Sequence, residues 1–218
     1  FASTAHTQVE WINRLLLQGI ALNYLDEDEA SKAQDKVFTQ EDVQKLVEKR
    51  YTDYIVQAKE EKPIGFSDSV ETLYLGQRNN IVSFSRMYQS YMGGAHGMYY
   101  KEYINMDIRK QAIIGLDDLM SPTNQAKLRD SLWNDYINSR TYEQGEQPYA
   151  NKEDFRISDS FYFTPNGITF VYPPYELGPF AEGEIELNAY FGQINEWLNS
   201  DYRLTEKDGF GLNQSEFF

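Results

Sequence analysis

The sequence contains no cysteine and only two histidines, His6 and His96. The absence of cysteine excludes disulfide bonds, thiolate nucleophiles and cysteine-ligated zinc sites. It also removes the hazard of mispaired thiols in an oxidising compartment, so it permits export. His6 lies near the expected frayed start of the chain, which leaves one structured imidazole for the whole protein. We therefore expect no metal site and no cofactor.

Basic residues are also scarce, because 20 Lys and Arg stand against 34 Asp and Glu and give a net charge of −14. Such a surface is poorly suited to neutralising phosphates, so we expect no nucleic-acid partner. A basic protein is the partner that this balance favours. The excess acid is concentrated in residues 141–218, which hold 14 acids and 4 bases.

Long apolar runs are missing as well. The longest, residues 15–17 (Leu-Leu-Leu), is followed at once by Gln18 and Gly19. A membrane-spanning helix needs about 20 apolar residues, so we expect no transmembrane segment in this chain. The sequence starts at Phe1 without the basic and apolar regions of a signal peptide, and we expect that a leader was removed.

The periodicity of apolar residues predicts an α+β fold with an antiparallel sheet, an inserted helix and packed N-terminal helices. Residues 1–62 have helical spacing, and Thr39 with Asp42 resembles a capping box. Alternation begins near Val70 and predicts strands. The predicted strands are 70–75, 81–91, 98–107, 160–163, 167–172 and 184–187. The predicted domains are a helical segment, 1–62, packed on the sheet, and an α+β domain, 63–218, with a loosely held C-terminal tail.

Several local signals refine this pattern. Ser121 followed by Pro122 predicts the start of the inserted helix. Residues 76–80 are expected to form a turn, and Asn166-Gly167 is expected to supply the positive φ of a hairpin turn. The acidic run 26–29 lacks the glycine and ligand alternation of a calcium loop, so we expect a solvated connection without a ligand.

Familiar catalytic motifs are absent from the sequence. There is no Gly-x-Ser-x-Gly elbow, no Gly-x-Gly-x-x-Gly fingerprint and no phosphate-binding loop. His96 is most simply a turn histidine. Carboxylate pairs such as Asp117-Asp118, or the alternating Glu182, Glu184 and Glu186, keep a glycosidase open as an alternative. With 34 acids such pairs also arise by chance, and we expect no catalytic residues.

The strongest local signal is the segment 172–183, which contains three prolines among aromatic and small residues. Prolines fix φ and remove backbone donors, so this segment is predicted to be a rigid loop outside the ladder. Rigid aromatic rings beside carboxylates lose little entropy on binding a cationic protein. The segment can equally serve only to route the chain around a corner of the sheet.

An ordered set of motifs resembles a known family. Residues 93–97 (Gly-Gly-Ala-His-Gly), 105–107 (Asn-Met-Asp), 116–120 (Leu-Asp-Asp-Leu-Met) and 172–183 (Tyr-x-x-Tyr-x-x-Gly-Pro-x-Ala-x-Gly) occur in the order found in the extracytoplasmic domain of RsiV-type anti-sigma factors. This module also occurs beside polysaccharide deacetylases and in bacterial lipoproteins. The resemblance covers about residues 70–198.

The resemblance implies a function by binding. In RsiV proteins this domain binds lysozyme, so it implies a cell-envelope module, periplasmic or lipid-anchored, that binds or inhibits a cationic, lysozyme-like muramidase. An immunity protein against a wall-degrading toxin is a further alternative. The oligomeric state is left open. The residues expected to contact the partner are Tyr172, Tyr175, Glu176, Phe180, Glu182, Glu184 and His96.

The sequence also departs from the family pattern. Met92 stands where a threonine is usual, and residues 109–111 (Arg-Lys-Gln) replace the usual Thr-Gly-Lys turn. The chain also shows no sigma-binding segment, so it resembles the sensor module without the signalling apparatus.

Overall fold

The computed structural model describes residues 1–61, 65–140 and 147–205 and divides the chain into two compact units. Unit 1 contains Phe1–Tyr74 and Ser85–Tyr99, and unit 2 contains Leu75–Phe84 and the described residues from Tyr100 onward. The predicted boundary between residues 62 and 63, and most of the predicted loose tail, lie outside the described residues. The division into 1–62 and 63–218 therefore stays a prediction.

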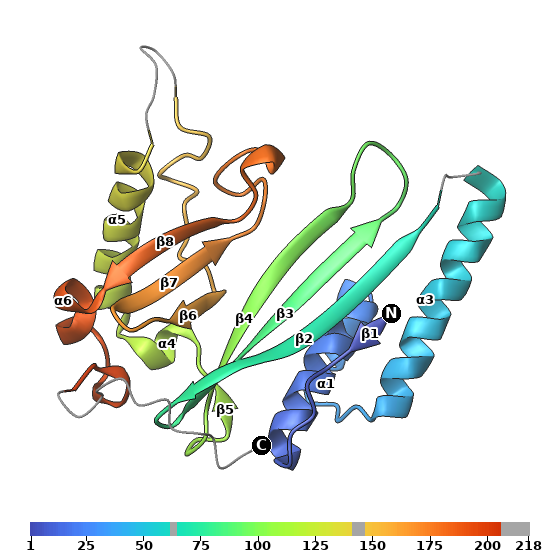
Figure 1. Ribbon diagram of the computed structural model, residues 1–218, viewed down its shortest axis with the longest axis horizontal. Coiled ribbons are helices and arrows are strands. Elements are labelled where there is room, and N and C mark those ends of the chain that lie inside the picture. Colours follow the sequence, from blue (N-terminus) through green and yellow to red (C-terminus); the bar gives the residue numbers. More distant parts are fainter. Residues whose placement is uncertain (62–64, 141–146, 206–218) are drawn as a thin grey trace. The chain divides into compact units, whose positions relative to one another are not determined.

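Unit 1 combines the N-terminal helices with parts of long strands (Figure 1). Its helices are α1 (Glu10–Tyr24), α2 (Glu27–Lys32) and α3 (Gln40–Glu61). Its strands are β1 (Ala2–Ser3) and parts of β2 (Ser67–Arg78), β3 (Ile81–Tyr91) and β4 (Met98–Asp107). The helices and strands share one apolar cluster, as predicted for helices packed on the sheet. The buried members of this cluster are Ile20, Ala21, Tyr24, Phe38, Val43, Val70 and Tyr88.

The start of α3 follows from its first residues. The Thr39 hydroxyl accepts a hydrogen bond from the Asp42 backbone N–H at 3.1 Å, and the Asp42 carboxylate accepts one from the Thr39 N–H at 2.9 Å. This reciprocal pair satisfies two donors that a helix start leaves open. The predicted capping box is confirmed.

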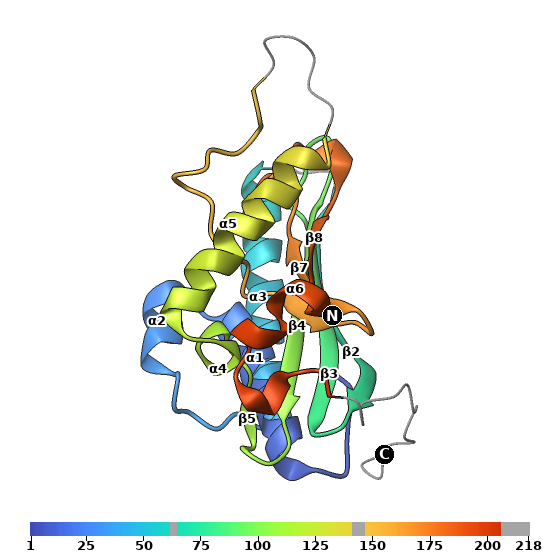
Figure 2. The same cartoon turned by 90° about the vertical axis from the view of Figure 1, so that its left-hand side faces the viewer.

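Unit 2 contains a second sheet and the inserted helix. Its further elements are β5 (Ala112–Ile113), α4 (Leu116–Leu119), α5 (Pro122–Asn138), β6 (Phe161–Phe163), β7 (Gly167–Tyr172), β8 (Ile185–Tyr190) and α6 (Phe191–Ile194). The first sheet has the order β1-β2-β3-β4-β5, with β1 parallel to β2, and the second, antiparallel, has the order β6-β7-β8. Helix α5 lies along one face of β7 and β8 (Figure 2). The predicted α+β fold with an antiparallel-dominated sheet is confirmed.

The inserted helix begins where the sequence predicts. The Ser121 side chain caps α5 by accepting a hydrogen bond from the Asn124 N–H, and Pro122 is the first residue of the helix. One stripe of the helix, Leu128, Leu132 and Tyr136, is fully buried against the second sheet. None of the helices in the described parts of the chain is both long and apolar enough to cross a bilayer.

The acidic run 26–29 is exposed, as predicted for a solvated charge run. It is also helical, because Asp26 caps α2 and the following acids occupy its first turn, where the helix dipole favours negative charge. Two local predictions are wrong. Strand β2 continues through residues 76–78, and the turn is confined to Asn79 and Asn80, with Asn79 at φ 50°.

The second wrong prediction concerns the turn before β7, because neither Asn166 nor Gly167 has a positive φ. A glycine is required at position 167 for a steric reason, because a Cβ atom there would lie 2.9 Å from the Ala189 carbonyl carbon on the neighbouring strand. The Thr164 hydroxyl accepts hydrogen bonds from both the Asn166 and the Gly167 N–H groups, and so closes this turn without a left-handed residue.

Candidate functional site

The proline-rich loop, residues 173–184, joins β7 to β8 within unit 2. The Tyr175 N–H donates to the Gly178 carbonyl at 2.9 Å, and the Glu176 N–H donates to the Pro173 carbonyl at 3.2 Å. A short 3₁₀ helix, Phe180–Glu182, follows and ends at Gly183, whose φ is 72°. The loop is therefore held by its own backbone hydrogen bonds, as its prolines predict.

Two aromatic residues of the loop form a surface pair. The rings of Tyr175 and Phe180 lie 5.7 Å apart between centroids, and Tyr175 is 45% exposed. Tyr175 also has a φ of 76°, which a residue with a Cβ rarely adopts. Strained backbone of this kind persists where surrounding structure enforces it and is concentrated at functional sites. Both residues were expected to contact a partner, and the structure brings them together.

Tyr172 differs from the expectation of an exposed anchor. Its side chain is fully buried, and its hydroxyl donates to the Arg156 carbonyl at 3.0 Å and accepts from the Ser158 N–H at 3.3 Å. Burial raises the pKa of this phenol far above its ordinary value. The correction has a simple cause: Tyr172 is the last residue of β7, and every residue of that strand is buried. Tyr172 is a core residue and presents no surface to a partner.

Helix α5 and the residue just beyond its end contact the proline-rich loop and hold it in place. The Tyr136 hydroxyl donates to the Leu177 carbonyl at 2.8 Å, and Leu177 is itself buried. Arg140, just beyond the end of α5, pairs with the Glu182 carboxylate at 2.6 Å and lies 4.9 Å above the Tyr136 ring. Glu182 was expected to face a partner, but its carboxylate ties the loop to the helix. Sequence reasoning missed Tyr136 and Arg140 as supports because each lies more than 40 positions from the loop residue that it contacts.

The remaining glutamates differ in their surroundings. Glu176 is exposed at the tip of the loop, and nearby protein atoms exclude enough water to raise the pKa of its carboxyl above 4.5. Glu184 is half-buried and pairs with Lys101 of β4 at 3.6 Å. Glu186 is exposed on β8. Among these glutamates, Glu176 therefore carries accessible negative charge within the proline-rich loop.

The carboxylate pair at the start of α4 is engaged in local structure. Asp117 accepts a hydrogen bond from the Gln125 side chain at 2.7 Å, and Asp118 accepts one from the Gly115 N–H at 3.0 Å. Across the described ranges, no three His, Asp or Glu side chains come together as metal ligands do. Three of the five acids proposed for a glycosidase, Asp117, Asp118 and Glu182, thus hold elements of unit 2 in place.

His96 lies in the turn between β3 and β4, in unit 1. It is exposed, and its Nδ1 lies 2.9 Å from the carbonyl oxygen of the adjacent Gly97. A Cβ at Gly97 would lie 2.7 Å from the Ser90 carbonyl oxygen, which explains why a glycine follows the histidine. The expectation that His96 contacts the same partner as the loop stays a prediction.

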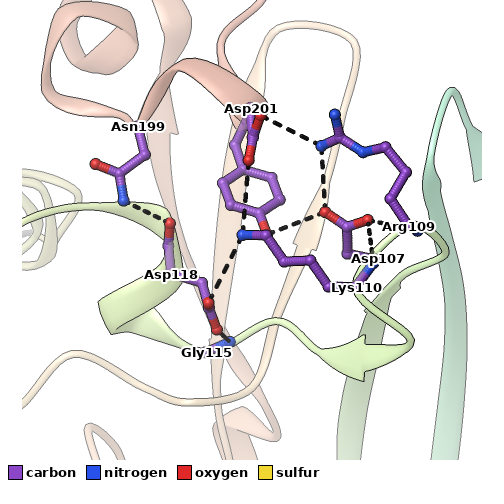
Figure 3. A network of polar contacts seen from close by, with 8 residues as sticks. Asp107, Arg109, Lys110, Gly115, Asp118, Asn199 and Asp201 are labelled. Atoms are coloured by element: carbon purple, nitrogen blue, oxygen red, sulfur yellow. Dashed lines mark hydrogen bonds and ion pairs between the residues drawn. The ribbon is translucent and has the colours of Figure 1, made fainter.

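Asp107 of the Asn-Met-Asp motif lies in a polar network at the end of β4 (Figure 3). Asp107 is 1% exposed and accepts hydrogen bonds from the Arg109 N–H at 2.8 Å and from the Tyr202 hydroxyl at 3.3 Å. Lys110 donates to the same Tyr202 hydroxyl at 3.0 Å and lies 3.6 Å from the Asp201 carboxylate. The Asn-Met-Asp motif therefore closes the turn after β4 and joins it to the 3₁₀ helix Ser200–Tyr202.

Asn105 has a similar role in the body of β4. Its side-chain oxygen accepts from the Ser83 hydroxyl at 2.7 Å, and its side-chain nitrogen donates to the Phe161 carbonyl at 2.6 Å. Nearby, the rings of Tyr103 and Tyr162 lie 4.6 Å apart. These contacts connect β4 to β6, and they explain why the motif carries an amide at this position.

A comparison with protein families matches part of the chain, residues 99–188. The matching family is DUF3298, described as "Protein of unknown function (DUF3298)". The DUF3298 match includes almost all of β4, the helix α5 and the whole proline-rich loop. The match shows a DUF3298 region in this chain, and the resemblance to RsiV-type proteins in particular stays a prediction.

Two solved structures from this family are similar to the chain. A DUF3298 family member from Bacteroides fragilis is 23% identical, with a TM-score of 0.68 over 88% of this chain and 78% of that chain. A DUF3298 family protein from Pseudomonas aeruginosa is 19% identical, with a TM-score of 0.49 over 70% of this chain and 71% of that chain. A search among curated proteins found no match. The likeness to the Bacteroides protein shows a shared fold.

Proposed function

We propose that the protein is an extracytoplasmic binding module that recognises a cationic, lysozyme-like muramidase, and that it acts by binding rather than by catalysis. The observation that carries this proposal is the Tyr175–Phe180 pair, with Tyr175 45% exposed on a loop held by prolines and by α5. Large aromatic side chains at the centre of an interface supply most of the binding free energy in many complexes. Because these rings are already fixed, ordering them on binding costs little entropy.

The charge around the pair supports a cationic partner. Residues 172–190 contain the four glutamates 176, 182, 184 and 186 and no Lys or Arg. The chain as a whole carries −14, so a basic protein is attracted over long range and its encounter is accelerated. Glu176 loses its charge at a higher pH than an ordinary glutamate does, because nearby protein atoms exclude water from its carboxyl and raise its pKa.

The identity of the partner rests on the resemblance. DUF3298 domains occur in RsiV-type proteins, whose envelope-exposed domain binds lysozyme, and the chain matches DUF3298 over the proline-rich loop. An envelope location follows from the same resemblance and is part of the proposal. The structural roles of Asp117, Asp118 and Glu182 favour binding over catalysis, since those carboxylates already have partners within the fold.

Surface plasmon resonance with hen lysozyme tests the proposal directly. We expect Tyr175→Ala to weaken binding by about 2 kcal/mol or more, which is roughly 30-fold in Kd. Tyr190→Ala is the matched control, because Tyr190 is 56% exposed at the opposite end of β8. That end is about 16 Å from the loop at the usual rise per strand residue. The control variant should bind like the unmodified protein.

Three results would contradict the proposal. The first is no binding to hen lysozyme at about 10 μM protein in low salt, a concentration that detects even weak specific complexes. The second is equal loss of binding in Tyr175→Ala and Tyr190→Ala. The third is turnover of peptidoglycan or chitin oligomers by the pure protein that Glu182→Gln or Asp117→Asn abolishes, which would establish the glycosidase alternative. Capture of a wall-degrading toxin in place of lysozyme would instead indicate an immunity protein.

A further inference from the structure

Unit 1 contains a pocket of about 460 Å³ formed by α2, α3 and the segment that connects them. Its lining has four lysines and two acids, which is a surplus of two positive charges. Residues 1–62 hold eight basic residues, and half of them line this pocket. In a chain with a net charge of −14, this is a local reversal of sign. The charged lining residues are Glu29, Lys32, Lys36, Asp42, Lys45 and Lys49.

Contacts within the fold account for three of these charged groups. Lys45 pairs with Glu41 at 2.7 Å, and the Lys36 ammonium lies 4.7 Å from the centroid of the Phe38 ring. The Asp42 carboxylate accepts two hydrogen bonds within the capping box of α3, at 2.8 and 2.9 Å. These three groups therefore have partners without a ligand.

Lys32 and Lys49 differ from them. Both are exposed, and within the described part of the chain neither side chain makes an ion pair, a hydrogen bond or a ring contact. Lys49 follows Lys45 by four positions on α3, and like charges at that spacing repel each other. Glu29 is the one acid of the lining outside such contacts, so the unpaired groups retain one positive charge in excess. An anion in the pocket would reduce the repulsion and give both lysines a partner.

The floor of the pocket is apolar. Leu25, Ala33 and Leu46 are half-buried and pack against the apolar cluster of unit 1, to which Phe38 belongs. A small inorganic anion could contact the lysines but would leave this floor in water. Covering the floor with an apolar group is favourable, because it removes apolar surface from water.

We propose that this pocket binds a small amphipathic anion, a molecule with a carboxylate or phosphate group on an apolar body. The anionic group contacts Lys32 and Lys49, and the apolar body covers the floor. The pocket volume is within the range of small-molecule sites, about 300–1,000 Å³. An uncharged apolar ligand would leave the two lysines without a partner, and a cationic ligand would be repelled by them.

A large polyanion suits this place poorly. Residues 25–49 hold eight acids beside the four lysines. An anionic membrane or a nucleic acid would meet those acids as well as the lysines, whereas a small anion can contact the lysines alone. The expected occupant is therefore a free small molecule.

Titration of the full, ¹⁵N-labelled chain, followed by ¹H–¹⁵N correlation NMR, tests this inference. The probe is decanoate, a carboxylate on an apolar tail, added to about 5 mM. Acetate has the same anionic group without the tail, and decyltrimethylammonium has the tail with the opposite charge. We expect decanoate to shift amide signals within residues 25–49 in a saturable way, with a Kd of about 1 mM. Acetate and decyltrimethylammonium should bind there at least about tenfold more weakly.

Paired substitutions separate the pocket from the overall charge. Lys32→Gln with Lys49→Gln removes the two unpaired ammonium groups, and we expect it to weaken decanoate binding about tenfold. Lys127→Gln with Lys152→Gln in unit 2 changes the net charge by the same amount and should leave binding unchanged. All four lysines are exposed, so both variants should stay folded, which melting curves verify.

Several results would contradict the inference. One is the absence of shifts within residues 25–49 at about 5 mM decanoate. Equal binding of acetate would indicate a site for bare anions, and equal binding of decyltrimethylammonium would indicate an apolar groove that ignores charge. Equal weakening by the two paired substitutions would mean that only the net charge matters. Sedimentation with anionic phospholipid vesicles, without any binding of decanoate, would assign the pocket to a membrane. None of these results bears on lysozyme binding, which is assigned to the proline-rich loop.

Discussion

Tyr172 and Tyr175 lie three positions apart and have opposite environments, since the first is fully buried and the second is 45% exposed. Tyr172→Phe removes a hydroxyl that has two backbone partners, Arg156 and Ser158. We expect it to lower the free energy of unfolding by about 1–2 kcal/mol, because the Ser158 N–H and the Arg156 carbonyl lose a partner. Tyr175→Ala should change stability little and weaken lysozyme binding. Urea unfolding of both variants measures the loss of stability, and surface plasmon resonance measures the loss of affinity for lysozyme.

The prediction has a definite point of failure. If Tyr172→Phe weakens lysozyme binding more than Tyr175→Ala does, then Tyr172 contacts the partner and the buried position described for it does not represent the binding state. A Tyr175→Phe variant serves as a further control, since it keeps the ring that contacts Phe180.

Sequence alone could not separate these two tyrosines. The prolines correctly identified the rigid loop, and alternation located β7. A strand that is buried on both faces has no exposed alternate positions, so the pattern contains no sign that Tyr172 faces inward. The strain at Tyr175 was equally invisible, because tyrosine carries no preference for a left-handed backbone.

Gly19 in the middle of α1 is explained by a buried arginine. Arg86 donates hydrogen bonds to the Thr72 hydroxyl at 3.2 Å and to the Leu16 carbonyl at 3.1 Å, and a Cβ on Gly19 would lie 2.7 Å from its guanidinium carbon. Alanine favours a helix by about 1 kcal/mol over glycine, but displacing a buried, hydrogen-bonded guanidinium costs more. We expect Gly19→Ala to destabilise the protein by about 2 kcal/mol and to lower the melting temperature by about 4–8 °C.

Gly192→Ala is the matched substitution for that measurement. Gly192 is also helical, and a Cβ there would have no neighbour within 4 Å. It should leave the melting temperature unchanged or raise it slightly. Equal effects of the two substitutions would mean that Arg86 moves aside without cost.

Among the elements, the turn from β4 to β5 makes the clearest prediction for pH (Figure 3). Burial alone would raise the pKa of the Asp107 carboxyl, but hydrogen bonds from Arg109 and Lys110 outweigh it and hold the pKa below its ordinary value of 3.8. A carboxyl whose pKa is lower in the folded state stabilises the fold above its unfolded pKa. That contribution is lost as the pH falls through the folded pKa.

We therefore expect Asp107→Asn to destabilise the protein by about 2 kcal/mol at pH 7 and by progressively less below about pH 4. Urea unfolding at pH 7 and at pH 3 measures the difference. Asp201→Asn is the control, because Asp201 is 42% exposed and pairs with Arg109 and Lys110 at the surface. Its effect should stay below about 1 kcal/mol. A destabilisation by Asp107→Asn that does not change with pH would show that shape, and not charge, is what the turn requires.

The elements were largely predictable, and their long-range partners were not. Local signals sufficed for the capping box at Thr39, the start of α5 at Ser121 and the strand 98–107. The turn after β4 was also expected, but the hydroxyl that stabilises it by donating to Asp107 belongs to Tyr202, 95 positions further along the chain. Helix periodicity likewise marks Tyr136 as buried without indicating that its hydroxyl holds Leu177. Contacts of that separation depend on topology, which a single sequence leaves open.

For the whole molecule, charge is the property that the sequence states most directly. The net charge of −14 was read without any structure, whereas the structure shows that individual carboxylates differ in availability. Glu182 and Glu184 are neutralised by Arg140 and Lys101, while Glu176 is exposed. The overall field should therefore govern the approach of a cationic partner, and a few local contacts should govern its retention.

This separation predicts how salt acts on the complex with hen lysozyme. Raising the salt from about 50 to 500 mM shortens the screening length from roughly 14 to 4 Å, so steering by the net charge is largely lost. We expect the association rate constant to fall by about tenfold or more, while the dissociation rate constant changes less than about threefold. Tyr175→Ala should have the reverse effect, because it removes a contact at the site and leaves the net charge unchanged. We expect its dissociation rate constant to be higher at every salt concentration, and its association rate constant to depend on salt as that of the unmodified chain does. Surface plasmon resonance at four salt concentrations, with the unmodified chain and this variant side by side, resolves the two rate constants. An association rate that is insensitive to salt would mean that the acidic charge does not guide the partner.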